Sequence, residues 1–297
     1  MKTYAVTGAT GNTGKIIVEQ LLEKGNKVRA IGRSAEKLAS LVEKGAEACV
    51  GSIDDETTLT KAFTGADGVY AMIPPDFQAK NFRAYQNHIG QAIANAITKA
   101  RVRNVVFLSS IGAHLSEKTG PIVGLYDQEQ RLNKLEGVDI LHLRPTLFME
   151  NFFNNIGTIK NMGANGSPIR GDISIPMIAT QDIGRYAAER LSKLDFSGHI
   201  AQELHGQRDL TMTEATSILG KAIGRDDLGY VQFPYEDAEK AMTQMGISPD
   251  GARTYVEMAK GFNEGIIIGV EPRSPENTTP TSLEDFAGTF AAAYNAS

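Results

Sequence analysis

The chain has 297 residues, 41% of them hydrophobic and 22% charged, which is enough apolar material to bury a full core and argues against disorder. A net charge of −5 and the lack of a long basic run disfavour nucleic acid as the main partner. The single cysteine, Cys49, excludes an internal disulfide, and its apolar neighbours predict a buried thiol. The sequence has no signal-peptide pattern and no run of about 18 apolar residues, so we expect a cytoplasmic protein without a membrane span.

The first half alternates short β-branched runs with amphipathic helical patterns, which is typical of a parallel sheet wrapped by helices. The clearest helix is predicted over residues 82–100, where apolar residues recur at steps of three and four. Right-handed crossovers between parallel strands then predict a doubly wound Rossmann sheet with its ligands at the carboxyl ends of the strands. The predicted strands are Tyr4–Thr7, Lys27–Ile31, Ala46–Val50, Gly68–Met72, Asn104–Ser109 and Asp139–Leu143.

The pattern changes after Pro145. We expect residues 1–150 to form the dinucleotide-binding domain and residues 151–297 a smaller, mainly helical lobe that binds the substrate. Asn161–Gly166 is polar and glycine-rich, which predicts a loop. Two pairs with capping-box spacing predict helix starts in this half: Thr211 with Glu214, and Thr281 with Glu284.

A glycine loop follows the first predicted strand directly and leads into a helix. Its spacing, Gly8, Gly11 and Gly14, allows a tight turn, close approach of the backbone to a pyrophosphate, and close packing of the helix on the strand. Free N–H groups at the helix start would face the phosphates. The cofactor-binding residues predicted here are Gly8, Thr10, Gly11, Asn12, Thr13 and Gly14.

The second strand ends in Arg33 and Ser34 rather than in the acidic residue that grips the ribose 2′-hydroxyl of NAD. A guanidinium pairs with a 2′-phosphate, which favours NADP(H) as the cofactor. The alternative is a surface arginine, with Ser34 capping the following helix, and Ser34 is able to do both.

With these segments in view, the chain resembles the NmrA-like group of atypical short-chain dehydrogenases, and within it the bacterial triphenylmethane and quinone reductases. The segments that carry the resemblance are Val6–Gly14, Gly51–Asp54, Arg144–Asn151 and Ala179–Gly184. The resemblance implies that Asp54 lies near the adenine and that Met72, Ile73 and Pro74 line the far edge of the cofactor. It also implies that Ser110 and Ile111 flank the nicotinamide, with Phe148 and Asn151 around the nicotinamide or substrate.

The chain departs from the wider family at its catalytic pair. Short-chain dehydrogenases use Tyr-x-x-x-Lys, and here the tyrosine is Tyr126 but the lysine position holds Gln130. A glutamine supplies no positive charge to stabilise a tyrosinate, so carbonyl reduction or sugar epimerisation is disfavoured. Tyr126 and Ser110 remain the candidate catalytic residues.

An aromatic stretch near the middle of the chain has two interpretations. Phe148, Met149, Phe152 and Phe153 form either a flat apolar wall for a substrate ring or a core-facing helix stripe. The first interpretation makes Phe152, with Phe148 and Asn151, a substrate-binding residue. The five histidines show no metal-ligand spacing, so we expect no metal site, and His142 is expected to be structural.

These observations predict an NADPH-dependent oxidoreductase that transfers a hydride to a small, electron-poor acceptor such as a quinone or dye-like aromatic. The alternative is a non-enzymatic regulatory protein that senses NADP(H) and binds a partner protein. A third possibility, an epimerase, is disfavoured by Gln130. The long helices that flank the sheet make a homodimer possible.

Overall fold

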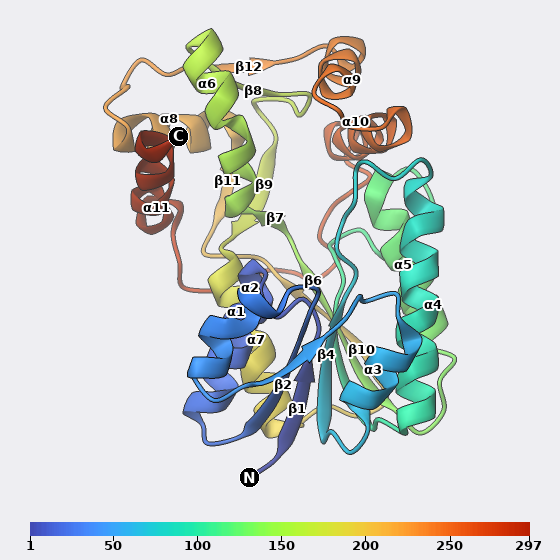
Figure 1. Cartoon of the computed structure of the whole chain (residues 1–297). Helices are drawn as coiled ribbons and strands as arrows, with labels where there is room; N and C mark the ends of the chain where they lie inside the picture. The colour runs from blue at the N-terminus through green and yellow to red at the C-terminus, as the bar shows by residue number, and fades with distance from the viewer.

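A parallel seven-stranded sheet forms the body of the molecule, and the computed structural model describes it together with the rest of residues 1–297 (Figure 1). The strand order is β10-β6-β5-β4-β1-β2-β3, so the order reverses between β1 and β4. The loops that follow these two strands diverge and leave a crevice at the carboxyl edge of the sheet. The strands are β1 (Thr3–Val6), β2 (Lys27–Gly32), β3 (Glu47–Val50), β4 (Gly68–Met72), β5 (Asn104–Leu108), β6 (Asp139–Pro145) and β10 (His199–Leu204).

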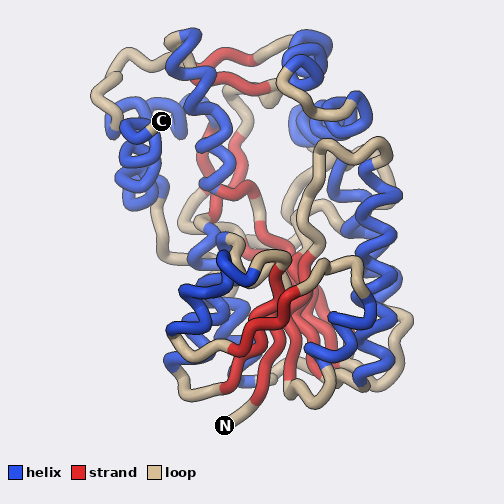
Figure 2. The backbone as a smooth tube through the Cα atoms, viewed as in Figure 1, coloured by secondary structure: helices blue, strands red, loops and turns tan.

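Helices cover both faces of this sheet, as Figure 2 shows. The apolar sides of the helices bury two clusters of about equal size, one on each face. The doubly wound fold predicted from the alternating pattern is therefore confirmed, and the helix expected over residues 82–100 has those bounds. One face carries α1 (Asn12–Glu23), α2 (Ala35–Glu43) and α7 (Thr180–Lys193); the other carries α3 (Glu56–Phe63), α4 (Phe82–Ala100) and α5 (Val123–Leu132).

The remaining elements build a second unit over the carboxyl edge of the sheet, around its own apolar cluster. Its strands pair in a three-stranded sheet, β11-β9-β7, and a two-stranded one, β12-β8. The strands are β7 (Leu147–Phe148), β8 (Asn165–Ser167), β9 (Ser174–Ile178), β11 (Asp209–Thr211) and β12 (Tyr230–Gln232). The helices are η1 (Gly120–Ile122), η2 (Met149–Asn155), α6 (Ile156–Met162), α8 (Met212–Ala222), α9 (Tyr235–Gln244), α10 (Pro249–Asn263) and α11 (Leu283–Ala296).

The division of the chain at residue 150 does not follow this packing. After β9 the chain returns to the body, where α7 packs on α1 and β10 pairs with β6 as an edge strand. Residues 180–204 therefore belong to the nucleotide-binding body, although they lie within the 151–297 range expected to form the lobe. No pattern in the sequence marks this return, because one helix followed by one strand also fits a separate lobe.

Three local expectations need correction. The expected loop over Asn161–Gly166 instead contains the end of α6 and the start of β8. The final helix starts one residue later than expected, with a capping box between Ser282 and Asp285, while the Thr211–Glu214 box is confirmed. Cys49 is only half-buried, because β3 is an edge strand with a neighbour on one side.

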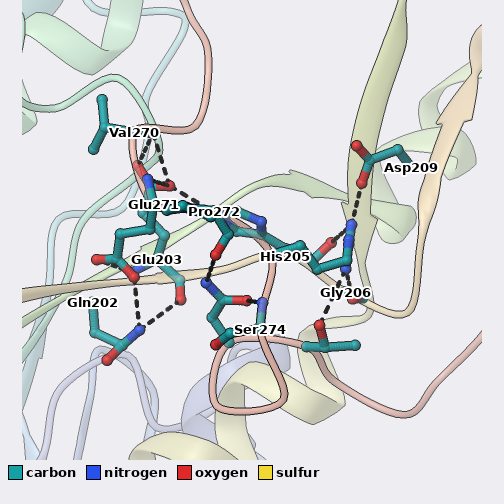
Figure 3. A network of polar contacts seen from close by, with 12 residues as sticks. Gln202, Glu203, His205, Gly206, Asp209, Val270, Glu271, Pro272 and Ser274 are labelled. Carbon is teal, nitrogen blue, oxygen red and sulfur yellow. Dashed lines mark hydrogen bonds and ion pairs between the residues drawn. The ribbon is translucent and has the colours of Figure 1, made fainter.

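A polar network ties the second unit back to β10 (Figure 3). The buried carboxylate of Glu203 accepts hydrogen bonds from the backbone N–H groups of Val270 and Glu271, each at 3.1 Å, and pairs with Nε2 of His205 at 3.0 Å. Burial raises the pKa of Glu203, but these hydrogen bonds outweigh it and hold the pKa below its usual range. Arg273 adds a hydrogen bond to the Gly206 carbonyl at 2.6 Å. Residues 270–273 of the second unit are thereby tied to the end of β10 and the residues that follow it.

No helix is both long and apolar enough to cross a bilayer. The outer faces of α4 and α5 are polar, with Arg83 held by both carboxylate oxygens of Asp127 at 2.7 and 2.8 Å. A homodimer through these helices stays a prediction.

His142 occupies a buried position in β6, with only 2% of its surface exposed. Its Nε2 lies 2.8 Å from Oδ1 of Asn133, and its ring packs edge-on against Phe107. Burial lowers the pKa of His142 to about 4; nearby Glu129 opposes this, while Arg144 and His199 add to it. The histidine is thus neutral in the folded protein, consistent with a structural role.

This lowered pKa predicts a loss of stability in mild acid. Below the ordinary histidine pKa of 6.5, the unfolded chain binds a proton that the folded chain does not take up until about pH 4. We therefore expect His142 to lower the free energy of unfolding by about 2 kcal/mol between pH 7 and pH 5. Urea unfolding of the wild type and His142→Gln at both pH values measures this difference; equal pH dependence in the two proteins would contradict the assignment.

Candidate functional site

The glycine loop between β1 and α1 has the geometry of a phosphate cradle. Gly8 has φ +60°, a left-handed conformation that favours glycine, and the N–H of Gly11 closes the turn on the Gly8 carbonyl at 2.9 Å. A Cβ at Gly14 would overlap that carbonyl, lying 2.8 Å from its carbon. No side chain caps α1, so the N–H groups at its start are free to face an anion. These features fit the pyrophosphate of a dinucleotide.

The other residues predicted in the loop divide by exposure. Thr10 and Asn12 are exposed at the crevice, whereas Thr13 is buried. The hydroxyl of Thr13 lies 2.9 Å from that of Tyr70 on β4, so the Thr13 side chain holds the start of α1 against this strand. Its contribution to a phosphate would come from the backbone N–H alone.

Sequence reasoning missed Thr7, which fixes the other side of the loop. Its hydroxyl donates to the Tyr70 carbonyl at 3.2 Å and accepts from the Met72 N–H at 3.1 Å. This pair of bonds holds the ends of β1 and β4 together at the switch point. A threonine at a strand end is too common for its position alone to indicate this role.

The residues predicted around the adenine and 2′-phosphate lie together beside the end of β2. Arg33 is exposed and makes no ion pair, whereas Ser34 accepts the Lys37 N–H at 3.3 Å and caps α2. Burial raises the pKa of the half-buried Tyr85 on α4; the carboxylates of Asp76 and Asp54 raise it further and Arg33 lowers it, so all three charges act in the space around this ring. A guanidinium without a protein partner in this space fits the 2′-phosphate of a phosphorylated ribose.

A cavity of about 350 Å³ lies between the carboxyl edge of the sheet and the second unit. Seven of the predicted site residues line it: Met72, Ile73, Ser110, Ile111, Phe148, Asn151 and Phe152. Pro74 is not on its wall, and its neighbour Pro75 is. Among the wall residues that sequence reasoning missed are three from the body: Phe77 before α4, Phe82 at its start and Thr146 after β6. Others come from the second unit, including Ser167, Met212, Tyr255, Met258 and Phe262.

The wall of this cavity has no charged side chain, and most of its residues are hydrophobic. Met72 lies between the cavity and the glycine loop: it lines the cavity, and a Cβ at Gly8 would lie 3.0 Å from its sulfur. A dinucleotide on the loop would therefore reach this apolar space. Such a space suits a flat, uncharged ring.

Buried groups under the cavity floor hold Ser109 in place. Its hydroxyl donates to Glu129 on α5 at 2.5 Å, and Arg144 grips the same carboxylate through two nitrogens at 3.0 and 2.5 Å. The Ser109 and Ile111 N–H groups donate to the Leu143 and Pro145 carbonyls, which continues the β5–β6 pairing past the strand end. These hydrogen bonds fix the position of Ser109, and the Glu129–Arg144 ion pair beneath the cavity carries no net charge.

Tyr126 does not line the cavity, although its neighbour Leu125 does. The turn of α5 places Asp127 against Arg83 and Asn87 on α4, and Gln130 is exposed. A catalytic role for Tyr126 therefore stays a prediction that the cavity does not support. The other candidate, Ser110, is on the wall.

The aromatic stretch divides between its two interpretations. Phe148 and Phe152 face the cavity, whereas Met149 is buried in the second core. Phe153 stacks on Phe290 of α11 with ring centres 6.2 Å apart and is absent from the wall. The 3-10 geometry of η2 explains the division, because successive residues point in different directions.

Known proteins match the chain along most of its length. A 27% identical relative, the NAD(P)H azoreductase of Xenophilus azovorans, covers 98% of this chain and 99% of its own length. The Escherichia coli NADPH-dependent quinone oxidoreductase, solved with NADPH, superposes with a TM-score of 0.80 at 21% identity, covering 97% of this chain and 99% of that one. The Citrobacter sp. triphenylmethane reductase, solved with NADP(H), gives 0.77 at 20% identity, with coverage of 97% and 99%.

The two solved structures show that the fold is shared; at about 20% identity they show the fold alone. The model of the NmrA-like family matches residues 1–286, which is nearly the whole chain. Together with the glycine cradle and the strand order, this match shows that the chain belongs to the NmrA-like family.

Proposed function

We propose that this protein is an NADPH-dependent reductase of small, neutral, electron-poor aromatic acceptors, such as quinones or azo compounds. The observation that carries the proposal is the uncharged cavity beside the glycine cradle, with Met72 on the cavity wall and next to Gly8. The related azoreductase and quinone oxidoreductase act on acceptors of this kind by name, which supports the choice.

The residues of the cradle hold the cofactor in this proposal. The free N–H groups at the start of α1 bind the pyrophosphate, and Arg33 binds the 2′-phosphate. When bound, the nicotinamide supplies the hydride. Ser110, Ile111 and Phe148 then position the reacting ring at the sheet edge.

The cavity contributes orientation and the exclusion of water. Phe148 and Phe152 present aromatic surface to a flat acceptor, and Asn151 lies at the exposed side of the wall. An acceptor that is already electron-poor needs little further activation. The absence of the Tyr-x-x-x-Lys pair is therefore compatible with hydride transfer.

The uncharged wall predicts discrimination against anionic acceptors. A sulfonate placed in this cavity would lose its water without gaining a cationic partner. We expect kcat/KM for a sulfonated quinone to be at least about tenfold below that of the neutral parent. Anaerobic NADPH oxidation with such matched pairs measures the ratio, and equal rates would contradict the cavity as the acceptor site.

The competing function is a sensor that binds NADP(H) and presents its state to a partner protein. Such a sensor has no need of an apolar cavity next to the nicotinamide end of the cradle, so the cavity favours the reductase. Comparable binding of both cofactor forms, without turnover of any acceptor, would favour the sensor instead.

A further inference from the structure

One ionisable side chain lines the acceptor cavity, and it comes from the second unit. Tyr255 lies on α10 between the first and last turns, and Met258 and Phe262 on the same helix also line the wall. The Tyr255 ring packs edge-on against Phe77 with centres 6.3 Å apart. No carboxyl, amine, imidazole, guanidinium or thiol group shares the wall, so Tyr255 alone among the lining residues is able to release a proton.

The Tyr255 hydroxyl has no hydrogen-bond partner in the protein, and on the same wall the hydroxyls of Ser110 and Thr146 lack one as well, whereas those of Ser109 and Ser167 are engaged. Ser109 donates to Glu129, and Ser167 lies 2.7 Å from the Tyr230 hydroxyl. Tyr230 itself donates to the Ile169 carbonyl at 2.6 Å and is fully engaged. Burial raises the pKa of Tyr230 to about 12, and the neighbouring phenol of Tyr255 adds to the rise. Tyr255 is therefore the one phenol on the wall, and it has no protein partner, while the remaining hydroxyls of the wall belong to serine and threonine, which are much weaker acids than a phenol.

We propose that Tyr255 is a catalytic residue that donates the proton required by acceptors such as quinones. This inference rests on the proposed reductase function. A quinone that has received a hydride carries two added electrons and one hydrogen, and its negative charge is on an oxygen. The O–H bond of Tyr255 breaks, a new O–H bond forms on that oxygen to give the hydroquinone, and solvent water returns a proton to the phenolate.

The ionisation of Tyr255 is compatible with this role. Burial raises the pKa of its phenol, so the hydroxyl keeps its proton throughout the neutral range and is ready to donate. The second unit thereby supplies the acid that the missing Tyr-x-x-x-Lys pair does not. Because α10 is far from the glycine loop in sequence, no local motif marks the residue.

The test compares acceptors that need a proton with one that does not. A cationic triphenylmethane dye becomes neutral when its central carbon takes up a hydride, whereas a quinone also requires a proton. In Tyr255→Phe we expect kcat/KM for a neutral quinone to fall at least about tenfold, and that for the dye to change less than about twofold. The solvent deuterium isotope effect on quinone turnover should fall with it. Tyr186→Phe is the control, since Tyr186 lies on α7 away from the cavity wall.

A binding measurement tests the same hydroxyl without turnover. 4-Nitrophenol is a probe for the developing oxyanion, and its phenolate is yellow. The wild type with NADP⁺ should lower the pKa of the bound probe relative to Tyr255→Phe, because the phenol donates to the anion. Spectral titration of the probe at the visible band of its phenolate gives this shift directly.

The outcomes separate the two proposals. A wild type that oxidises NADPH with none of the acceptors overturns the proposed function. If the wild type is active but Tyr255→Phe lowers kcat/KM for quinone and for dye by the same factor, and the bound probe has the same pKa in both proteins, the role of Tyr255 is overturned and the proposed function is not. Loss of the quinone-specific rate in Tyr126→Phe, with Tyr255→Phe unaffected, would assign the acid to Tyr126 instead.

Discussion

Replacement of Gly14 by alanine is expected to abolish dinucleotide binding, with a loss of affinity of more than about 100-fold. The added Cβ would overlap the Gly8 carbonyl, which is backbone and has no flexible side chain to move aside. Either the turn opens or α1 moves away from β1, and both changes displace the free N–H groups from the phosphates. Titration of the variant with NADPH by calorimetry measures the effect.

The matched control is Gly288→Ala on α11. Gly288 is exposed, and a Cβ there would meet nothing within 4 Å. This variant should bind NADPH like the wild type and gain up to about 1 kcal/mol of stability from improved helix propensity. Unchanged NADPH affinity in Gly14→Ala would show that the cradle is not the phosphate site.

Replacement of Arg33 by alanine is expected to weaken the binding of NADPH without a matching loss for NADH. The guanidinium is exposed and makes no ion pair within the protein, so its removal should cost mainly the charge-assisted contact with the 2′-phosphate. Such contacts contribute about 1.5–3 kcal/mol, which corresponds to a loss of about 10–100-fold in NADPH affinity. Binding of NADH, which lacks the phosphate, should change little.

The conservative variant Arg33→Lys separates charge from shape in this contact. Lysine keeps the positive charge but offers no planar fork, so we expect an NADPH affinity between those of the wild type and Arg33→Ala. Equal losses for NADPH and NADH in Arg33→Ala would instead indicate a general disturbance of the β2 end.

The parts of the site that are local in sequence were predictable. The glycine loop joins one strand to the helix that follows it, and the spacing of its glycines is enough to predict the turn. Arg33 follows by a fixed topological rule, since the second strand of this fold ends beside the adenine ribose. Most of the first-half strands were likewise expected within a residue or two, because their apolar runs are short and bounded by turn residues.

The parts that depend on distant packing were not predictable. Ser109, Glu129 and Arg144 meet from three separate segments, and no pattern links them in the chain. The orientation of α5 decides that Leu125 and not Tyr126 reaches the cavity, and this orientation is set by contacts with α4. Tyr255 reaches the site only because α10 folds back over the sheet edge.

Single-turnover oxidation of bound NADPH is the measurement that decides whether this protein is a reductase of neutral acceptors. The wild type, loaded with one equivalent of NADPH, is mixed anaerobically with a neutral quinone while NADPH absorbance and hydroquinone formation are followed together. For a reductase we expect NADPH to disappear in step with hydroquinone formation, and deuterium at the transferred position of the nicotinamide to slow the reaction. Tight NADPH binding with no oxidation by any neutral quinone or azo acceptor would contradict this expectation and point to a cofactor-sensing role.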